Sequence, residues 1–322
     1  MFDFINVPFG YILRFFAQIF NGNFAASVFA FTLLINVILI PLSIKSQKSS
    51  VSQMRVKPKL DELKKKYGDD RRRMAEEQQK LYQEEGISFA GGCLPLIVRM
   101  VLLLSIYWLI LSPLTYMAGA EKATVENVTN HMSAESNSKN SNQLRLVKVI
   151  IEDINGDENA VKNAFTDENF DSVKDDYNYV KEKYKEANIN FDLFGIDLTS
   201  TPNFSFDIFN KFEWVWLLPI SAFLAQMLTS VVSMRINKRI NPDAPTMAGM
   251  LLIMPVISLF IGFNFPGGVC FYWICSSLIG GAIQSCVQVF YGPHRLLARE
   301  REKELSKVCD FENGQRKKFE TE

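Results

Sequence analysis

Four polar side chains interrupt long apolar runs of this chain, and their chemistry needs an explanation. Arg99 lies nine residues into the apolar run 91–113. An arginine at the centre of a membrane span costs roughly 2.5–3.5 kcal/mol on insertion scales, so it requires water, a partner or an acidic ligand. The other three side chains are uncharged amides, Asn36, Gln226 and Gln284, each inside another apolar run.

These four residues share one depth if each apolar run crosses a bilayer. Asn36, Arg99 and Gln226 are each eight residues from the same end of their spans, and Gln284 is six residues from it. At ~1.5 Å per residue, eight residues correspond to about 12 Å. Because polar groups within spans face the bundle interior or water, the pattern predicts a hydrated pocket. Two alternatives stay open: Arg99 snorkels toward the headgroups, and the amides only join neighbouring helices by hydrogen bonds.

The elements that would position these residues are five apolar blocks. The chain has 322 residues and is 48% hydrophobic, and its apolar residues gather in segments of membrane-spanning length. About 20 residues are needed to cross ~30 Å of hydrocarbon. We therefore predict an all-α, polytopic membrane protein with five transmembrane helices, at 24–44, 91–113, 213–234, 246–264 and 268–290.

Residues 1–20 form a separate amphipathic segment. Phe4, Ile12 and Phe15 recur at helical spacing, which predicts an interfacial helix lying in the headgroup plane. Asp3 and Arg14 interrupt the run, and neither a basic start nor a small-residue cleavage pattern is present. The segment is therefore expected to remain uncleaved.

The distribution of basic residues predicts the orientation. Twelve Lys and Arg fall in 45–88, and three more lie in the loop 235–245. The positive-inside rule places both segments in the cytoplasm. With five spans, an odd number, the tail 291–322 is then expected on the same side. The N-terminus and the region 114–212 are then outside, and that region holds seventeen acidic and ten basic residues. We expect a multi-pass protein of the cytoplasmic (plasma) membrane.

Two polar regions have their own predicted structure. Region 45–90 is expected to form a cytoplasmic helical hairpin, with helices over 49–66 and 71–85. Pro58 is expected to limit the first of these helices, because it removes a backbone donor. Outside, residues 121–188 predict a small inserted helical subdomain.

The sequence contains no pattern that indicates an enzyme. It lacks a Gly-rich phosphate loop, a Ser/His/Asp set and zinc-ligand spacing, and His131 and His294 are far apart. The five cysteines, Cys93, Cys270, Cys275, Cys286 and Cys309, lie at the spans or in the tail without metal-ligand spacing. We expect no catalytic residue, no metal, no cofactor and no direct nucleic-acid partner.

Short motifs occur in series along the chain. They are Ile40-Pro41-Leu42, Lys57-Pro58-Lys59-Leu60, Lys80-Leu81-Tyr82-Gln83-Glu84-Glu85-Gly86, Gly91-Gly92-Cys93-Leu94-Pro95-Leu96, Phe194-Gly195-Ile196-Asp197-Leu198, Trp216-Leu217-Leu218-Pro219, Met254-Pro255, Phe265-Pro266-Gly267-Gly268 and Tyr272-Trp273. In this order they resemble the YidC/Oxa/Alb membrane protein insertases, in particular the Gram-positive type. The resemblance covers nearly everything except 121–188 and the tail.

The resemblance implies an insertase and chaperone that receives nascent membrane proteins in a cytoplasm-open hydrophilic groove and releases their spans into lipid. The expected groove residues are Arg99, Asn36, Gln226, Gln284 and Trp216, and the expected cytoplasmic reception residues are Lys57, Lys64, Arg71, Arg72 and Arg73. The implied partners are clients with acidic tails and membrane lipids. The Sec translocon, the signal recognition particle pathway and the ribosome are further candidates.

This chain departs from the family pattern at two places. The family's groove arginine lies at the position of Asn36, whereas the site of Arg99 is usually glutamine. We therefore hypothesise that Arg99 performs the arginine's role from the opposite wall. The insertion 121–188 is longer than the bridge in Gram-positive relatives. Gram-negative relatives carry a large extracytoplasmic domain before their core, and this sequence shows none before the segment 1–20, so a single-membrane bacterium is the expected source. Two alternatives remain: a small secondary transporter using the same polar layer, and a receptor whose ligand binds 121–188.

Overall fold

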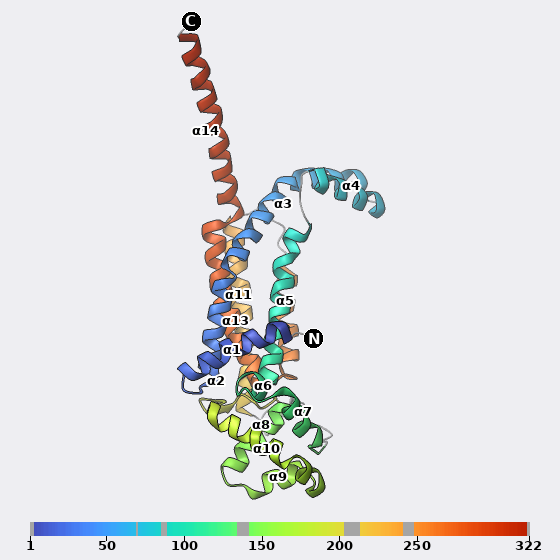
Figure 1. The fold of residues 1–322 in the computed structure, drawn as a ribbon. Coiled ribbons are helices and arrows are strands. Elements are labelled where there is room, and N and C mark those ends of the chain that lie inside the picture. The colour runs from blue at the N-terminus through green and yellow to red at the C-terminus, as the bar shows by residue number, and fades with distance from the viewer. Residues whose placement is uncertain are drawn as a thin grey trace. The chain divides into compact units, whose positions relative to one another are not determined.

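The computed structural model describes residues 3–68, 70–84, 89–133, 142–202, 213–240 and 248–320. Within these residues the fold is mostly helical (Figure 1). The chain divides into two units, which are described separately. The first contains 1–37, 100–231 and 247–281, and the second contains 38–99, 232–246 and 282–322.

Candidate membrane spans are long apolar helices. Two single helices in the described part of the chain qualify, Trp214–Arg239 and Gly267–Tyr291. A third is the pair Phe24–Ile38 and Ile40–Gln47, if its 42° bend is counted within one span. The corresponding elements are α2 (Phe24–Ile38), η1 (Trp214–Trp216) with α11 (Leu217–Ile240), and α13 (Gly267–Tyr291). The structure thus supports two or three spans, fewer than the five predicted.

The predicted second and fourth spans fall on two further helices. They are α5 (Phe89–Leu111) and α12 (Ala248–Gly262), which contains Pro255. Their apolar parts among the described residues, Met100–Leu111 and Ile253–Gly262, are too short to qualify as spans by length and composition. Their membrane crossing therefore remains a prediction.

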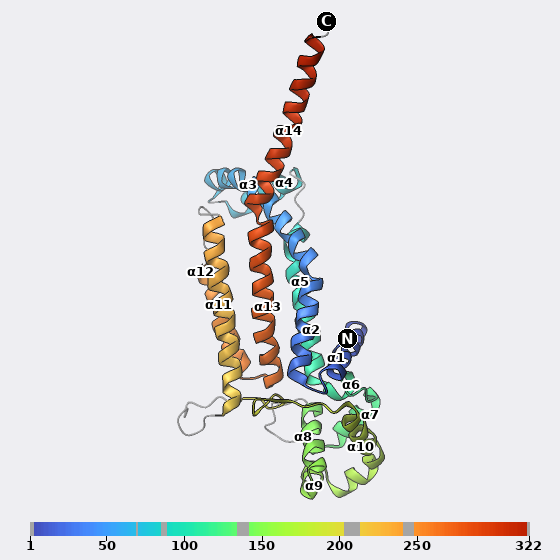
Figure 2. The ribbon, with the colours of Figure 1, turned by 90° about the vertical axis from the view of Figure 1, so that its left-hand side faces the viewer.

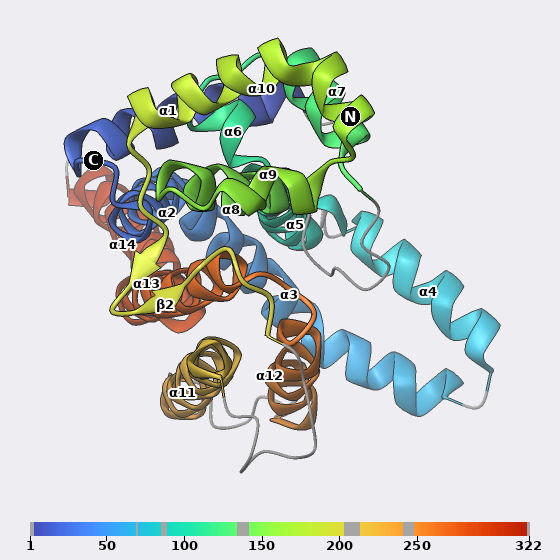
Figure 3. The same ribbon diagram turned by 90° about the horizontal axis from the view of Figure 1, so that it is seen from below.

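A helical subdomain with its own core lies between α5 and α11 in sequence. Its helices are α6 (Pro113–Tyr116), α7 (Lys122–His131), α8 (Asn142–Ile154), α9 (Glu158–Ala164) and α10 (Asp167–Ala187). Figure 3 shows α10 lying along α7. Leu146, Ile150 and Val180 are fully buried, and Tyr177 packs edge-on against Phe165 with ring centroids 6.1 Å apart. This apolar core stabilises the subdomain by removing its side chains from water.

Helix α1 (Asp3–Ile19) exposes an apolar face. Phe4, Tyr11 and Phe15 are 78%, 68% and 58% exposed, whereas Leu13 and Ala17 on the other face are buried. A helix that turns three large aromatic side chains away from the protein is suited to contact lipid. The placement of α1 in the headgroup plane stays a prediction.

The second unit contains the charged helices. They are α3 (Ile40–Tyr67), α4 (Arg71–Glu84) and α14 (Pro293–Glu320). The expectation that Pro58 limits the first helix is wrong, because α3 continues through this residue. A proline removes one backbone hydrogen bond, and the remaining hydrogen bonds of a long helix are sufficient to keep it helical. Helix α3 is in contact with α4 and also with α14, the helix of the tail.

Candidate functional site

Asn36 on α2 faces a glycine on α13. Its Nδ2 donates a hydrogen bond to the carbonyl oxygen of Thr32, at 2.9 Å. Its Oδ1 lies 3.0 Å from the point where a Cβ at Gly280 would be. The absent side chain at Gly280 therefore makes room for the amide, which is half-buried between the two helices.

Gln226 on α11 is joined to α12. The Ser258 hydroxyl lies 2.8 Å from Oε1 of Gln226 and 2.8 Å from the carbonyl oxygen of Pro255, and it can donate to either. Both side chains are half-buried. This contact is of the kind by which polar residues join helices within a membrane, so it gives Gln226 a structural role.

A second contact between helices lies close to Asn36 and Gln226 along the helix axes, and it joins α11 to α13. A Cβ at Gly281 would lie 2.4 Å from Cγ2 of Thr229, so only glycine fits this approach. Thr229 is one turn after Gln226, and Gly281 follows Gly280, which Asn36 contacts. The structure therefore brings Asn36 and Gln226 to one level of the first unit, on either side of α13.

The other predicted groove residues lie elsewhere or outside the described residues. Arg99 is on α5, but its side chain lies outside the described residues. Gln284 is on the part of α13 that belongs to the second unit. Trp216 lies ten residues before Gln226, is 3% exposed and packs edge-on against Phe263 at 5.9 Å. Trp216 is therefore buried near the start of α11, not at the level of Asn36.

The predicted reception residues lie on α3 and α4. Lys64, Arg72 and Arg73 are exposed, while the side chains of Lys57 and Arg71 lie outside the described residues. Arg72 pairs with Glu76 at 3.2 Å, and Arg73 pairs with Asp70 at 3.5 Å. Exposed pairs of this kind contribute at most about 1 kcal/mol, so the two guanidinium groups can exchange these partners for an acidic ligand.

A strap, defined as residues 188–200, connects the starts of two candidate spans. The backbone N–H of Phe24 donates to the carbonyl of Asn190 at 3.0 Å. The N–H groups of Gly267 and Gly268 donate to the carbonyls of Ser200 and Leu198, both at 2.8 Å. The first N–H groups of a helix have no partner within the helix, and the strap supplies partners to α2 and α13. No local sequence pattern predicted this connection.

The comparison with known families covers most of the chain. A family profile described as "60Kd inner membrane protein" matches residues 15–292, from α1 to the end of α13. The chain belongs to this family. This membership agrees with the resemblance read from the short motifs, and it makes the protein a multi-pass membrane protein.

Individual relatives of the 60Kd inner membrane protein family align over shorter segments. The chain is 42% identical over 106 residues to a membrane protein insertase YidC of Haemophilus ducreyi, which is 33% of this chain and 19% of that protein. It is 46% identical over 90 residues to a membrane protein insertase YidC of Pseudomonas fluorescens, which is 28% of this chain and 16% of that protein. The chain thus spans about a fifth or less of the relatives it matches.

Asp197 holds the strap of this 60Kd family member together. Its carboxylate accepts hydrogen bonds from the backbone and hydroxyl of Thr199 and from the hydroxyl of Ser200, at 2.6–2.9 Å. Lys148 on α8 lies 3.5 Å away. Burial raises the pKa of Asp197, but these donors and the lysine outweigh it and hold the pKa below its usual value. The carboxylate therefore stays ionised and ties the strap to α8.

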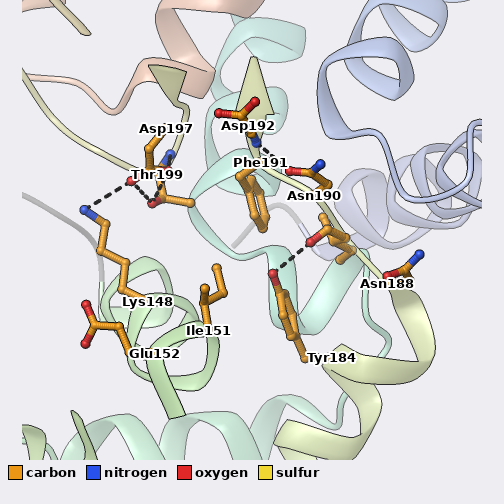
Figure 4. Close-up of a pocket in the computed structure, with 11 residues that line it drawn as sticks. Lys148, Ile151, Glu152, Tyr184, Asn188, Asn190, Phe191, Asp192, Asp197 and Thr199 are labelled. Carbon is orange, nitrogen blue, oxygen red and sulfur yellow. Dashed lines mark hydrogen bonds and ion pairs between the residues drawn. The ribbon is translucent and has the colours of Figure 1, made fainter. Parts of the chain in front are cut away.

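A cleft of about 580 Å³ separates α8 from the strap (Figure 4). Lys148 and Glu152 lie on its α8 side, and Phe191 and Asp192 lie on the strap side. Tyr184 closes one end, because its hydroxyl donates to the carbonyl of Ile189 at 2.8 Å. The residues come from segments more than 30 positions apart, so the cleft could not be found from local spacing.

Proposed function

We propose that this protein is a membrane protein insertase that receives nascent spans and releases them into lipid. The observation that carries the proposal is membership of the 60Kd inner membrane protein family over residues 15–292. The two aligned relatives are membrane protein insertases, which agrees with it. We also propose a five-span core, in which α5 and α12 cross the membrane between α2, α11 and α13.

In the proposed mechanism, Arg99 attracts the acidic tail of a client into a hydrated groove. A cation in a low-dielectric site attracts a carboxylate more strongly than it does in water. Asn36, Gln226 and Gln284 would hydrogen-bond to water and to the client backbone beside Arg99. Trp216, which is buried, would support the groove only indirectly, by packing the start of α11 against Phe263. The client's apolar segment then enters lipid by the hydrophobic effect, so the protein needs no catalytic group or nucleotide.

The basic side chains of α3 and α4 would make first contact with a client on the cytoplasmic side. Lys64, Arg72 and Arg73 are exposed, which supports this role, and Lys57 and Arg71 are proposed to contribute with them. Nascent chains also imply partners that deliver them. We propose the Sec translocon, the signal recognition particle pathway and the ribosome as these partners. The Gram-positive subtype stays a prediction from the motifs.

The test is insertion of a short, acidic-tailed membrane protein into vesicles that contain the purified full chain. Protease protection of the client tail measures insertion. Arg99→Gln should reduce insertion of this client, and adding Asn36→Arg should restore it, because the cation returns from the opposite wall. Arg239→Gln, an exposed position at the end of α11, is the control for loss of one positive charge. A client whose tail carries amides in place of carboxylates should be insensitive to Arg99→Gln. Normal insertion of the acidic client by Arg99→Gln would refute the role of Arg99.

The proposed orientation puts the N-terminus outside and the C-terminus inside. Cys309 on α14 is exposed and lies in the proposed cytoplasmic tail. A membrane-impermeant maleimide should modify Cys309 in inside-out vesicles and leave it unmodified in intact cells. Cys309→Ser is the matched control, since it removes only this thiol. Modification of Cys309 in intact cells would reverse the orientation.

A further inference from the structure

The strap carries an aromatic residue in an unusual backbone conformation. Strands β1 (Asp192–Leu193) and β2 (Ile196–Asp197) are joined by the two residues Phe194 and Gly195, whose φ angles are +53° and +84°. A turn with positive φ at both central residues favours Asn-Gly, and a bulky residue at its first position is strained. Phe194 is nevertheless 97% exposed, the largest exposed fraction of any large apolar side chain in the described part of the chain.

Local hydrogen bonds hold this tip in place. The Asp192 carboxylate accepts a bond from the backbone N–H of Gly195 at 3.1 Å. The backbone N–H of Asp192 in turn donates to the side chain of Asn190 at 2.8 Å. The chain therefore maintains a strained turn whose only large side chain makes little contact with the protein. Strain of this kind persists where it serves a function.

The strap lies where the candidate spans begin. Its backbone is hydrogen-bonded to the first residues of α2 and α13, and β2 contacts η1, which leads into α11. Figures 2 and 3 both show the strands beside the starting end of α13. Trp214 of η1 is 68% exposed. Two exposed aromatic side chains therefore occur at the end of the bundle from which three candidate spans enter the bilayer.

We propose that Phe194 and Trp214 insert into the phospholipid headgroup region of the leaflet at which α2, α11 and α13 begin. The occupant of this surface is the bilayer, because the surface is continuous with helices that cross it. Trp is enriched at the membrane interface, and Phe inserts there on the apolar faces of interfacial segments, where its ring leaves water. The β-hairpin formed by β1 and β2 would thereby fix the strap against the membrane. The strap would in turn hold the starts of α2 and α13 at one depth. This inference depends on membrane crossing by these helices and is independent of insertase activity.

The test measures the depth of a fluorophore on the hairpin. Phe194→Cys is made in a full chain that also carries Cys93→Ser, Cys286→Ser and Cys309→Ser, and it is labelled with a nitrobenzoxadiazole group. Cys270 and Cys275 are buried and are retained. The protein is reconstituted into phosphatidylcholine vesicles, with or without lipids that carry a nitroxide in the headgroup or near the start of the acyl chain. We expect a blue-shifted emission and loss of most of the fluorescence with nitroxide lipids.

The matched control is Ile154→Cys in the same background. Ile154 is a large apolar residue that is 41% exposed, and it ends α8 just before α9. Figure 2 shows α9 at the end of the subdomain far from α13. The label at 154 should emit as in water and be insensitive to nitroxide lipids. Trp214→Cys is the second test position, for use if Phe194→Cys impairs folding.

Two results would overturn the proposal. One is a label at 194 and at 214 that behaves as the label at 154 does. The other is a label that is shielded only after a client protein is added, which would make the client the occupant. Both results are separate from the insertion assay, so a failed anchor and a failed insertase are distinguishable.

Discussion

Neighbouring glycines of α13 offer a controlled measure of how closely the spans pack. Gly280 and Gly281 lie in the same helix, so alanine gains the same helix propensity at each position, roughly 1 kcal/mol. Their surroundings differ. At Gly280 the nearest atom to a new Cβ is Oδ1 of Asn36, at 3.0 Å, which is the end of a side chain that can rotate. At Gly281 the new Cβ would lie 2.4 Å from Cγ2 and 2.8 Å from Cβ of Thr229.

Thr229 cannot move away easily. Its hydroxyl lies 3.1 Å from the carbonyl oxygen of Ala225 and 3.0 Å from that of Gln226, so a rotamer change would remove a hydrogen bond. Its Cβ is fixed to the α11 backbone, and relief of the 2.8 Å contact requires a shift of the helix. Overpacking of this kind costs about 1–3 kcal/mol. Gly281→Ala should therefore be less stable than Gly280→Ala by about 1–3 kcal/mol, because the propensity terms cancel in the comparison.

The assay is unfolding of the full chain in mixed micelles by added sodium dodecyl sulfate, followed by circular dichroism. Thr229→Ser removes Cγ2 and keeps the hydroxyl, so it should recover part of the loss in the Gly281→Ala background. Gly280→Ala should have native stability or slightly more. Equal stability of the two alanine variants would refute the close approach of α11 and α13 at this level.

Two further predictions concern the helical subdomain. Burial raises the pKa of Asp153, but hydrogen bonds from Lys181 and Tyr177 outweigh burial and lower the pKa below its usual value. The stabilisation that Asp153 provides is therefore present above its unfolded-state pKa and is lost as pH falls through its folded-state pKa. The difference in melting temperature between the native chain and Asp153→Asn should thus shrink below about pH 4. Tyr184→Phe should lower the unfolding free energy by about 1–2 kcal/mol in the same micelle assay, because it leaves the buried carbonyl of Ile189 without its donor.

Composition and periodicity were sufficient to locate the long apolar helices, since burial in lipid demands continuous apolar runs. The predicted spans 213–234 and 268–290 fall on α11 and α13. The break at Leu39 within the predicted first span was missed, although Pro41 lies just after it. Proline there removes a backbone donor in the first turn of α3, which permits the bend between α2 and α3.

Long-range contacts could not be predicted in the same way. The strap is stabilised by hydrogen bonds between residues 190–200 and residues near 22 and 267, and no periodicity encodes such pairs. The depth comparison did suggest that Asn36 and Gln226 share a level, because helical rise is constant. It could not show what each amide contacts. Gly280 beside Asn36 and Ser258 beside Gln226 became visible only with the folded helices.

The bond between Ser258 and Gln226 decides how the polar layer should be tested. If Gln226 only joins α11 to α12, Gln226→Leu and Ser258→Ala should lower stability by similar amounts, about 0.6–2 kcal/mol, and lower insertion in proportion. If Gln226 also serves the proposed groove, Gln226→Leu should reduce insertion of an acidic-tailed client more than Ser258→Ala does at equal stability. A double-mutant cycle with both substitutions separates the two roles. Both single variants lose the hydrogen bond between the helices, whereas only Gln226→Leu loses a groove side chain. If insertion follows stability alone in the two single variants and the double variant, Gln226 is not a groove residue. Arg99 and Asn36 would then account for the chemistry of the groove.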